Sequence, residues 1–176
     1  MLPVVFLVLS VAFGASASSC SSSVKGIEVD RKSLEGKWWI QVQYGAPPVT
    51  DSRCYTQTLS LNSDGRLNNV ASWKVGSKTT TEGTPEIPPP EGSSTSSGEY
   101  YFLLKDGSGI ETAWFVQVDY KEYMAVYGCE NGETAVFLIA TRNLERNKTR
   151  INEIAESVAK VVTLPEGKHW TDITDC

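Results

Sequence analysis

The stretch Leu34-Glu35-Gly36-Lys37-Trp38-Trp39-Ile40-Gln41-Val42-Gln43-Tyr44 decides the fold of this chain. Its glycine is a turn residue, and the first tryptophan opens a segment with apolar side chains at every second position. This alternation predicts a β-strand with one buried face. Because the strand lies early in a strand-rich chain, we expect it to begin a closed barrel with a bulky indole at one end. Such a barrel is a cup that can hold a small molecule.

Similar strand patterns recur along the chain and are separated by turn sequences such as Asn62-Ser63-Asp64-Gly65. With residues 38–44 they predict eight strands, the others being residues 53–61, 67–75, 78–84, 100–104, 110–118, 123–129 and 134–141. The stretch 85–98 is rich in Pro, Ser and Gly and could be a domain linker or a long loop. We favour a loop, because neither side could easily complete a core alone.

One helix is expected, late in the chain. In residues 151–162 the apolar side chains recur at three- and four-residue spacing, which is the period of an amphipathic helix. The following Leu164-Pro165-Glu166-Gly167 ends it. A single helix can cover one patch of a barrel wall, and nothing suggests alternating βαβ units.

The start of the chain indicates the compartment. Residues 1–14 are almost uninterrupted apolar sequence, and Ala15-Ser16-Ala17 is a small-x-small cleavage site. We therefore predict a secretory signal peptide, residues 1–17, followed by a single domain, residues 18–176. The apolar run is too short to favour a membrane anchor, so we expect no integral membrane segment in the mature chain. The formal net charge of −5 argues against nucleic acid or an anionic membrane as partner.

The four cysteines, Cys20, Cys54, Cys129 and Cys176, are an even number in a chain expected to be extracellular. They predict two disulfides, for which three connectivities are open. None of them has CxxC spacing, which argues against a metal site or thioredoxin-like chemistry. Asn147-Lys148-Thr149 is an acceptor for N-glycosylation if it is exposed.

Three short blocks of this sequence resemble the lipocalin family. They are Gly36-Lys37-Trp38, the segment Val118-Asp119-Tyr120 followed by a Tyr-rich strand that ends in Cys129, and the lone Arg142 after the last strand. The resemblance implies an all-β fold, an eight-stranded antiparallel up-and-down barrel with one C-terminal α-helix packed outside. It also implies structural roles for Gly36, Trp38, Asp119, Tyr120 and Arg142, with the Arg142 guanidinium lying across the Trp38 indole.

The order and spacing of the cysteines resemble the apolipoprotein D and retinol-binding group of that family. This resemblance implies the pairs Cys20–Cys129 and Cys54–Cys176. The family's function implies secreted transport of a small hydrophobic molecule, of the retinoid, carotenoid, bilin, fatty acid or steroid class. The ligand would be bound non-covalently and without a cofactor, and pairing into homo- or hetero-oligomers remains open.

Alternation along each strand predicts which side chains line the cup. Counting from Trp38, and from the family register at the Asp-Tyr block and at Arg142, we expect a mostly apolar wall with a few polar groups. Its expected members are Val42, Tyr44, Tyr55, Gln57, Ala71, Trp73, Tyr100, Phe102, Phe115, Gln117, Met124, Val126, Val136 and Leu138. A slip of one residue would turn every side chain of a strand to the other face.

Two other functions stay open. Bulky residues could fill the barrel and leave an extracellular interaction or inhibitor module. A prostaglandin-isomerase-like enzyme would need a free cysteine thiolate, whereas all four cysteines fit the disulfide pattern. A Ser-His-Asp site is unsupported, because the single histidine, His169, lies outside the expected strands. We therefore expect a binding protein and not an enzyme.

Overall fold

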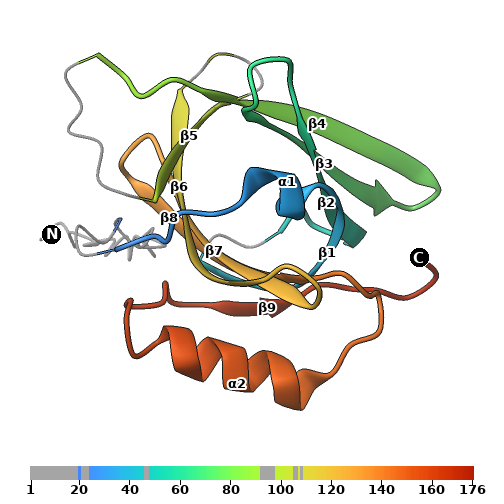
Figure 1. Ribbon diagram of the computed structural model, residues 1–176. Helices are drawn as coiled ribbons and strands as arrows, with labels where there is room; N and C mark the ends of the chain where they lie inside the picture. The colour runs from blue at the N-terminus through green and yellow to red at the C-terminus, as the bar shows by residue number, and fades with distance from the viewer. Residues whose placement is uncertain (1–19, 21–23, 46–47, 92–97, 105–106, 108) are drawn as a thin grey trace, which may run out of the picture.

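The computed structural model describes residues 20, 24–45, 48–91, 98–104, 107 and 109–176 (Figure 1). Among them, eight strands form a closed antiparallel barrel in chain order, and β1 closes it by pairing with both β8 and β2. The eight-stranded prediction is confirmed. The strands are β1 Gly36–Gly45, β2 Ser52–Leu61, β3 Leu67–Val75, β4 Lys78–Ile87, β5 Glu99–Leu103, β6 Ile110–Asp119, β7 Tyr123–Glu130 and β8 Thr134–Thr141. The predicted signal peptide lies outside the described residues.

Strand β4 runs further than the sequence pattern suggested. It continues through Pro85, which lies opposite Asn68 of β3, and ends at Ile87. Proline lacks an N–H group and is tolerated in a strand where one edge needs no hydrogen bond. The edge of β4 that faces β5 pairs with it at only two positions, Glu86 and Ile87, so a proline fits beside them.

The predicted helix is present outside the barrel as α2, Lys148–Val158 (Figure 1). It begins three residues before the predicted start, because the Asn147 side chain caps it by accepting from the Arg150 N–H. It ends four residues early, although Val162 still packs into the same apolar cluster. Two shorter elements were not predicted, the single-turn α1, Arg31–Leu34, and β9, Lys168–Trp170, which pairs with β1.

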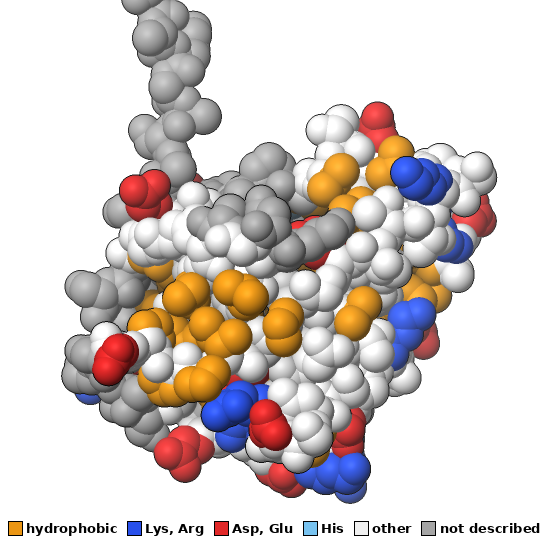
Figure 2. All heavy atoms as spheres, turned by 90° about the horizontal axis from the view of Figure 1, so that it is seen from above, with side chains coloured by type: hydrophobic (Ala, Val, Ile, Leu, Met, Phe, Trp, Pro, Cys, Tyr) orange, Lys and Arg blue, Asp and Glu red, His pale blue; other side chains and the backbone are white. Residues whose placement is uncertain are grey.

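The molecule has two apolar cores on the two faces of the barrel wall. The outer one lies between α2, which contributes Ile154, and the outward side chains of β7 and β8, among them Phe137 and Ile139. The inner one fills the barrel near its floor and includes Trp38, Leu67 and Phe115. Seen over the side where β4 and β5 lie, hydrophobic side chains gather toward one part of the face, with charged ones around them (Figure 2).

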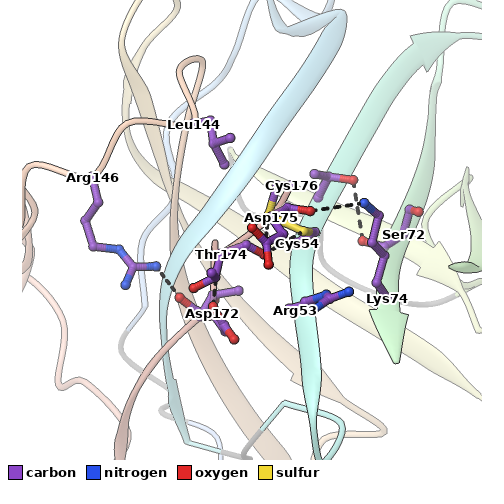
Figure 3. The surroundings of a disulfide bond; sticks show 12 residues. Arg53, Cys54, Ser72, Lys74, Leu144, Arg146, Asp172, Thr174, Asp175 and Cys176 are labelled. Atoms are coloured by element: carbon purple, nitrogen blue, oxygen red, sulfur yellow. Dashed lines mark hydrogen bonds between the residues drawn. A yellow bond between two sulfur atoms is a disulfide. The ribbon is translucent and has the colours of Figure 1, made fainter. Parts of the chain in front are cut away.

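Both implied disulfides are present, Cys20–Cys129 and Cys54–Cys176. The second one ties the end of the chain to β2 (Figure 3). Around it, the Cys54 N–H donates to the Asp172 carbonyl at 2.7 Å, and Lys74 Nζ donates to the Asp175 carbonyl at 3.4 Å. The tail is thereby held along the outside of the barrel.

Candidate functional site

The interior of the barrel contains a cavity that opens at one end. The empty space in the cavity and in the solvent at its mouth is together about 430 Å³, but little of it is wide enough for the centre of a water molecule. Its wall is formed by side chains of β2, β3, β5, β6, β7 and β8. The lining residues are Gln57, Leu59, Asn69, Phe102, Glu111, Ala113, Phe115, Met124, Val126, Gly128, Val136 and Leu138.

The floor of the barrel is a contact between Trp38 and Arg142. The guanidinium carbon lies 3.6 Å from the centre of the indole, which is fully buried. The indole N–H donates to the Leu34 carbonyl at 2.8 Å, so α1 is attached to the same contact. The resemblance implied this arrangement, and the structure has it. A desolvated cation–π pair contributes about 2 kcal/mol.

Arg142 also makes hydrogen bonds that join separate segments at the floor. Its side chain donates to the carbonyls of Ser33 (2.8 Å), Glu35 (2.9 Å) and Tyr120 (3.1 Å). Gly36 leaves the space for this side chain, since its φ is +108° and a Cβ there would lie 3.0 Å from Arg142 Nη1. Burial lowers the pKa of Arg142, although a guanidinium remains charged.

The Asp119-Tyr120 block holds the turn between β6 and β7. The Asp119 carboxylate accepts from the Lys121 N–H at 2.9 Å, and the Tyr120 hydroxyl accepts from the Asp30 N–H at 2.8 Å. These contacts attach the N-terminal segment and the turn to the closed end. They are structural, and neither residue lines the cavity.

Half of the predicted wall residues lie on the cavity. These are Gln57, Phe102, Phe115, Met124, Val126, Val136 and Leu138. Of the remainder, Tyr100 belongs to the inner core beneath the cavity, where its hydroxyl accepts from the Val29 N–H at 3.0 Å. Ala71 lies opposite Gln57 and shares its inward face, and Tyr55 stacks on Trp73 with ring centres 5.2 Å apart.

The prediction that Val42 and Tyr44 line the cavity is wrong. The pairing of β1 with β8 skips Gln41, which forms a β-bulge, and the side chains beyond it change face. Val42 is buried in the outer core, and Tyr44 packs against that core. The bulged Gln41 is itself buried, with its amide donating to Thr141 Oγ1 at 2.9 Å and accepting from Arg146 Nε at 3.2 Å.

The inward placement of Gln117 is wrong for the same reason. The register of β6 against β7 shifts between Phe115 and Gln117, so Gln117 lies opposite the outward-facing Ala125. Val118 packs against the inner core in its place. No turn residue or glycine marks either bulge in the sequence.

Sequence reasoning missed Glu111, the one acidic residue on the cavity wall among the described residues. Burial, and secondarily the charge of Glu130, raise the pKa of Glu111 from 4.5 to about 7. Glu111 is partly buried where it lines the cavity. The signal was available, because counting back by twos from Phe115 passes Ala113 and reaches Glu111.

Comparisons with known proteins bear on the fold. No known family profile matches the sequence, and no curated protein matches it either. Among solved structures, a chain described as the major allergen Per a 4 from cockroaches has a similar fold, with a TM-score of 0.62. The match covers 90% of this chain and 97% of that one at 16% sequence identity, which supports the barrel architecture alone.

The described residues also bear on membranes and metals. None of the helices there has the length and apolar character needed to cross a bilayer. In the same residues, no group of three or more His, Cys, Asp or Glu side chains is arranged to hold a metal ion.

Proposed function

We propose that this chain is a secreted lipocalin that binds and carries a small hydrophobic molecule inside its barrel. One observation carries the proposal, an open-ended cavity with a mostly apolar wall, in a barrel whose floor is closed by Trp38 and Arg142. Transfer of apolar ligand surface from water to such a wall contributes about 25 cal/mol per Å². The two disulfides are consistent with an extracellular location.

We propose further that the chain is related to one group of lipocalins. The cysteine pairing supports a place beside apolipoprotein D and the retinol-binding proteins. Retinoids, carotenoids, bilins, fatty acids and steroids are the ligand classes that this relation suggests. The narrowness of the cavity favours a smaller member of these classes, or a ligand whose entry is accompanied by movement of the wall.

The test is binding of a neutral apolar dye, Nile red, followed by its fluorescence, with the protein variant Val126→Phe. Val126 lies on the cavity wall and packs against the inner core, so the larger ring should occupy ligand space. Val161→Trp adds bulk to an exposed site beyond α2 and is the control. We expect Val126→Phe to weaken dye binding at least tenfold and the control to leave it unchanged. Equal binding by all three proteins would place the dye outside the barrel and contradict the proposal.

The same narrowness favours one alternative, an extracellular interaction or inhibitor module with a filled barrel. If neither Nile red nor any ligand recovered by native mass spectrometry binds, that alternative is preferred. We propose binding in place of catalysis, since the isomerase chemistry considered above needs a free thiol and all four cysteines are in disulfides.

A further inference from the structure

The cavity wall carries one carboxyl group, that of Glu111, which no described residue neutralises. Glu111 extends from β6 between Phe102 of β5 and Glu130 of β7, its neighbours in the sheet. Across the described part of the chain, its carboxylate makes no hydrogen bond or ion pair with another residue. A buried carboxylate in that condition is costly, and the cost is removed by protonation or by a nearby cation.

The wall is shaped around this carboxylate. Gly128 of β7 lies on the same cavity, and a Cβ at that position would lie 2.4 Å from Glu111 Oε1 and 2.9 Å from Val136 Cγ1. Any other residue at this position would force the carboxylate to move. The glycine thus leaves the space in which the Glu111 carboxylate lies against the wall.

Among the described residues, the titratable groups that act on Glu111 and its neighbour Tyr55 are acidic or neutral. Glu130 faces it from β7, and both of these carboxylates act with Glu82 of β4 on the Tyr55 hydroxyl of β2. Burial and these three charges raise the pKa of Tyr55 to about 12, so the phenol stays neutral. The described residues therefore give this part of the cavity a negative charge, which disfavours a carboxylate ligand and favours a cation.

Aromatic rings lie near this charge. Phe102 and Phe115 are on the cavity wall, and Tyr55 and Trp73 stack with an interplanar angle of 10° on the neighbouring strands β2 and β3. Aromatic faces attract ammonium groups and also pack against an apolar or aromatic ligand body. Together with the narrow cavity, these rings suit a compact molecule.

We propose that the ligand of this barrel is a compact primary amine, bound in its protonated form with Glu111 as the counter-charge. The amine would carry an apolar or aromatic body that fills the remainder of the cavity. This inference rests on the proposed carrier function and narrows its ligand class. It disfavours fatty acids and retinoic acid, whose carboxylates would meet Glu111 and Glu130.

The test compares three ligands of like shape by isothermal titration calorimetry, namely 2-phenylethylamine, 2-phenylethanol and 3-phenylpropanoate. At pH 8, above the pKa of Glu111, we expect the amine to bind at least tenfold more tightly than the alcohol, and the acid to bind weakest. Glu111→Gln should abolish the advantage of the amine. Glu156→Gln removes an equal charge from the exposed face of α2 and should retain it.

The pH dependence is a second readout. At pH 5.5 Glu111 is protonated in the free protein, so the affinity for the amine should fall at least tenfold from its value at pH 8, while that for the alcohol should stay level. If the alcohol binds as well as the amine, the amine proposal is overturned and the carrier function stands. If none of the three ligands binds and Nile red also fails, both proposals fall.

Discussion

The guanidinium of Arg142 joins three segments of the chain at the barrel floor. It stacks on Trp38 and donates to carbonyls of α1, of the residue before β1 and of the turn after β6. Lysine would keep the charge but lacks the planar fork of donors that makes these contacts together. The residue is therefore specified by geometry as well as by charge.

For this reason we expect Arg142→Lys to lower the free energy of unfolding by about 2–3 kcal/mol, since hydrogen bonds from charged groups are lost. Urea denaturation followed by tryptophan fluorescence measures the change. Arg66→Lys is the matched control, because Arg66 makes a 3.7 Å ion pair with the exposed Asp64 and should shift stability by less than about 0.5 kcal/mol. If both substitutions changed the free energy of unfolding equally, the planar guanidinium of Arg142 would have no special structural role.

The raised pKa of Glu111 also predicts how the free energy of unfolding depends on pH, without any ligand. The pKa of Glu111 is about 7 in the folded chain and 4.5 when the group is solvated, as in the unfolded chain. Between pH 4.5 and about pH 7 the folded protein therefore holds an extra proton. Stability from this group is accordingly lost as pH rises from about 4.5 to about 7. We expect Glu111→Gln to be more stable than the wild type at pH 8, by about 3 kcal/mol at most.

The measurement is the difference in unfolding free energy between Glu111→Gln and wild type, at pH 5 and pH 8 without ligand. Other titrating groups cancel in this difference. It should grow with pH, and a constant difference would show that Glu111 titrates normally.

Among the elements, α2 begins at a residue with two possible roles. Asn147 is exposed and caps the helix with its side-chain oxygen, and it is also the acceptor of a glycosylation sequon. The cap uses Oδ1, whereas a glycan is attached through Nδ2, so the two roles are compatible. Loss of an asparagine cap costs about 1 kcal/mol.

We expect secretion from eukaryotic cells to yield protein with a glycan on Asn147, detected by intact mass before and after amidase treatment. Thr149→Ala should remove the glycan and keep the cap. Asn147→Ser should do the same with a different capping oxygen, while Asn147→Ala should also lower stability by about 1 kcal/mol. A single unmodified mass from the wild type would contradict the glycosylation prediction.

Across the whole molecule, the barrel is unevenly closed. Strands β7 and β8 pair over eight positions, whereas β4 and β5 pair only at Glu86–Phe102 and Ile87–Tyr101. From Lys78 to Pro85, β4 thus has one edge without a strand partner among the described residues. Local opening needs the least free energy where few backbone bonds must break.

We expect hydrogen exchange measured by mass spectrometry to be fastest, among the barrel strands, in peptides from β4, and slowest in β7 and β8. The reason is that β7 and β8 are also covered by α2. The comparison is internal and needs no substitution. Equal protection of β4 and β8 would show that the barrel opens only as a whole.

The periodicity of the sequence was sufficient to predict the strands and the outer helix, because alternation at two and at three to four residues is a local property. The closing Trp38–Arg142 contact and the disulfide pairs were implied by short blocks whose residues lie far apart in the chain. Leu138 and Met124 were placed on the inner wall by counting from these blocks.

Only the tertiary structure decided where the counting fails. A bulge at Gln41 turns Val42 and Tyr44 outward, and the register shift after Phe115 turns Gln117 outward. Each bulge depends on bonds to distant segments, such as those of Gln41 to Thr141 and Arg146, which no local pattern contains. The environment of Glu111 is likewise a tertiary property, because the strands that meet around it place Phe102 and Glu130, and no described cation, beside its carboxylate.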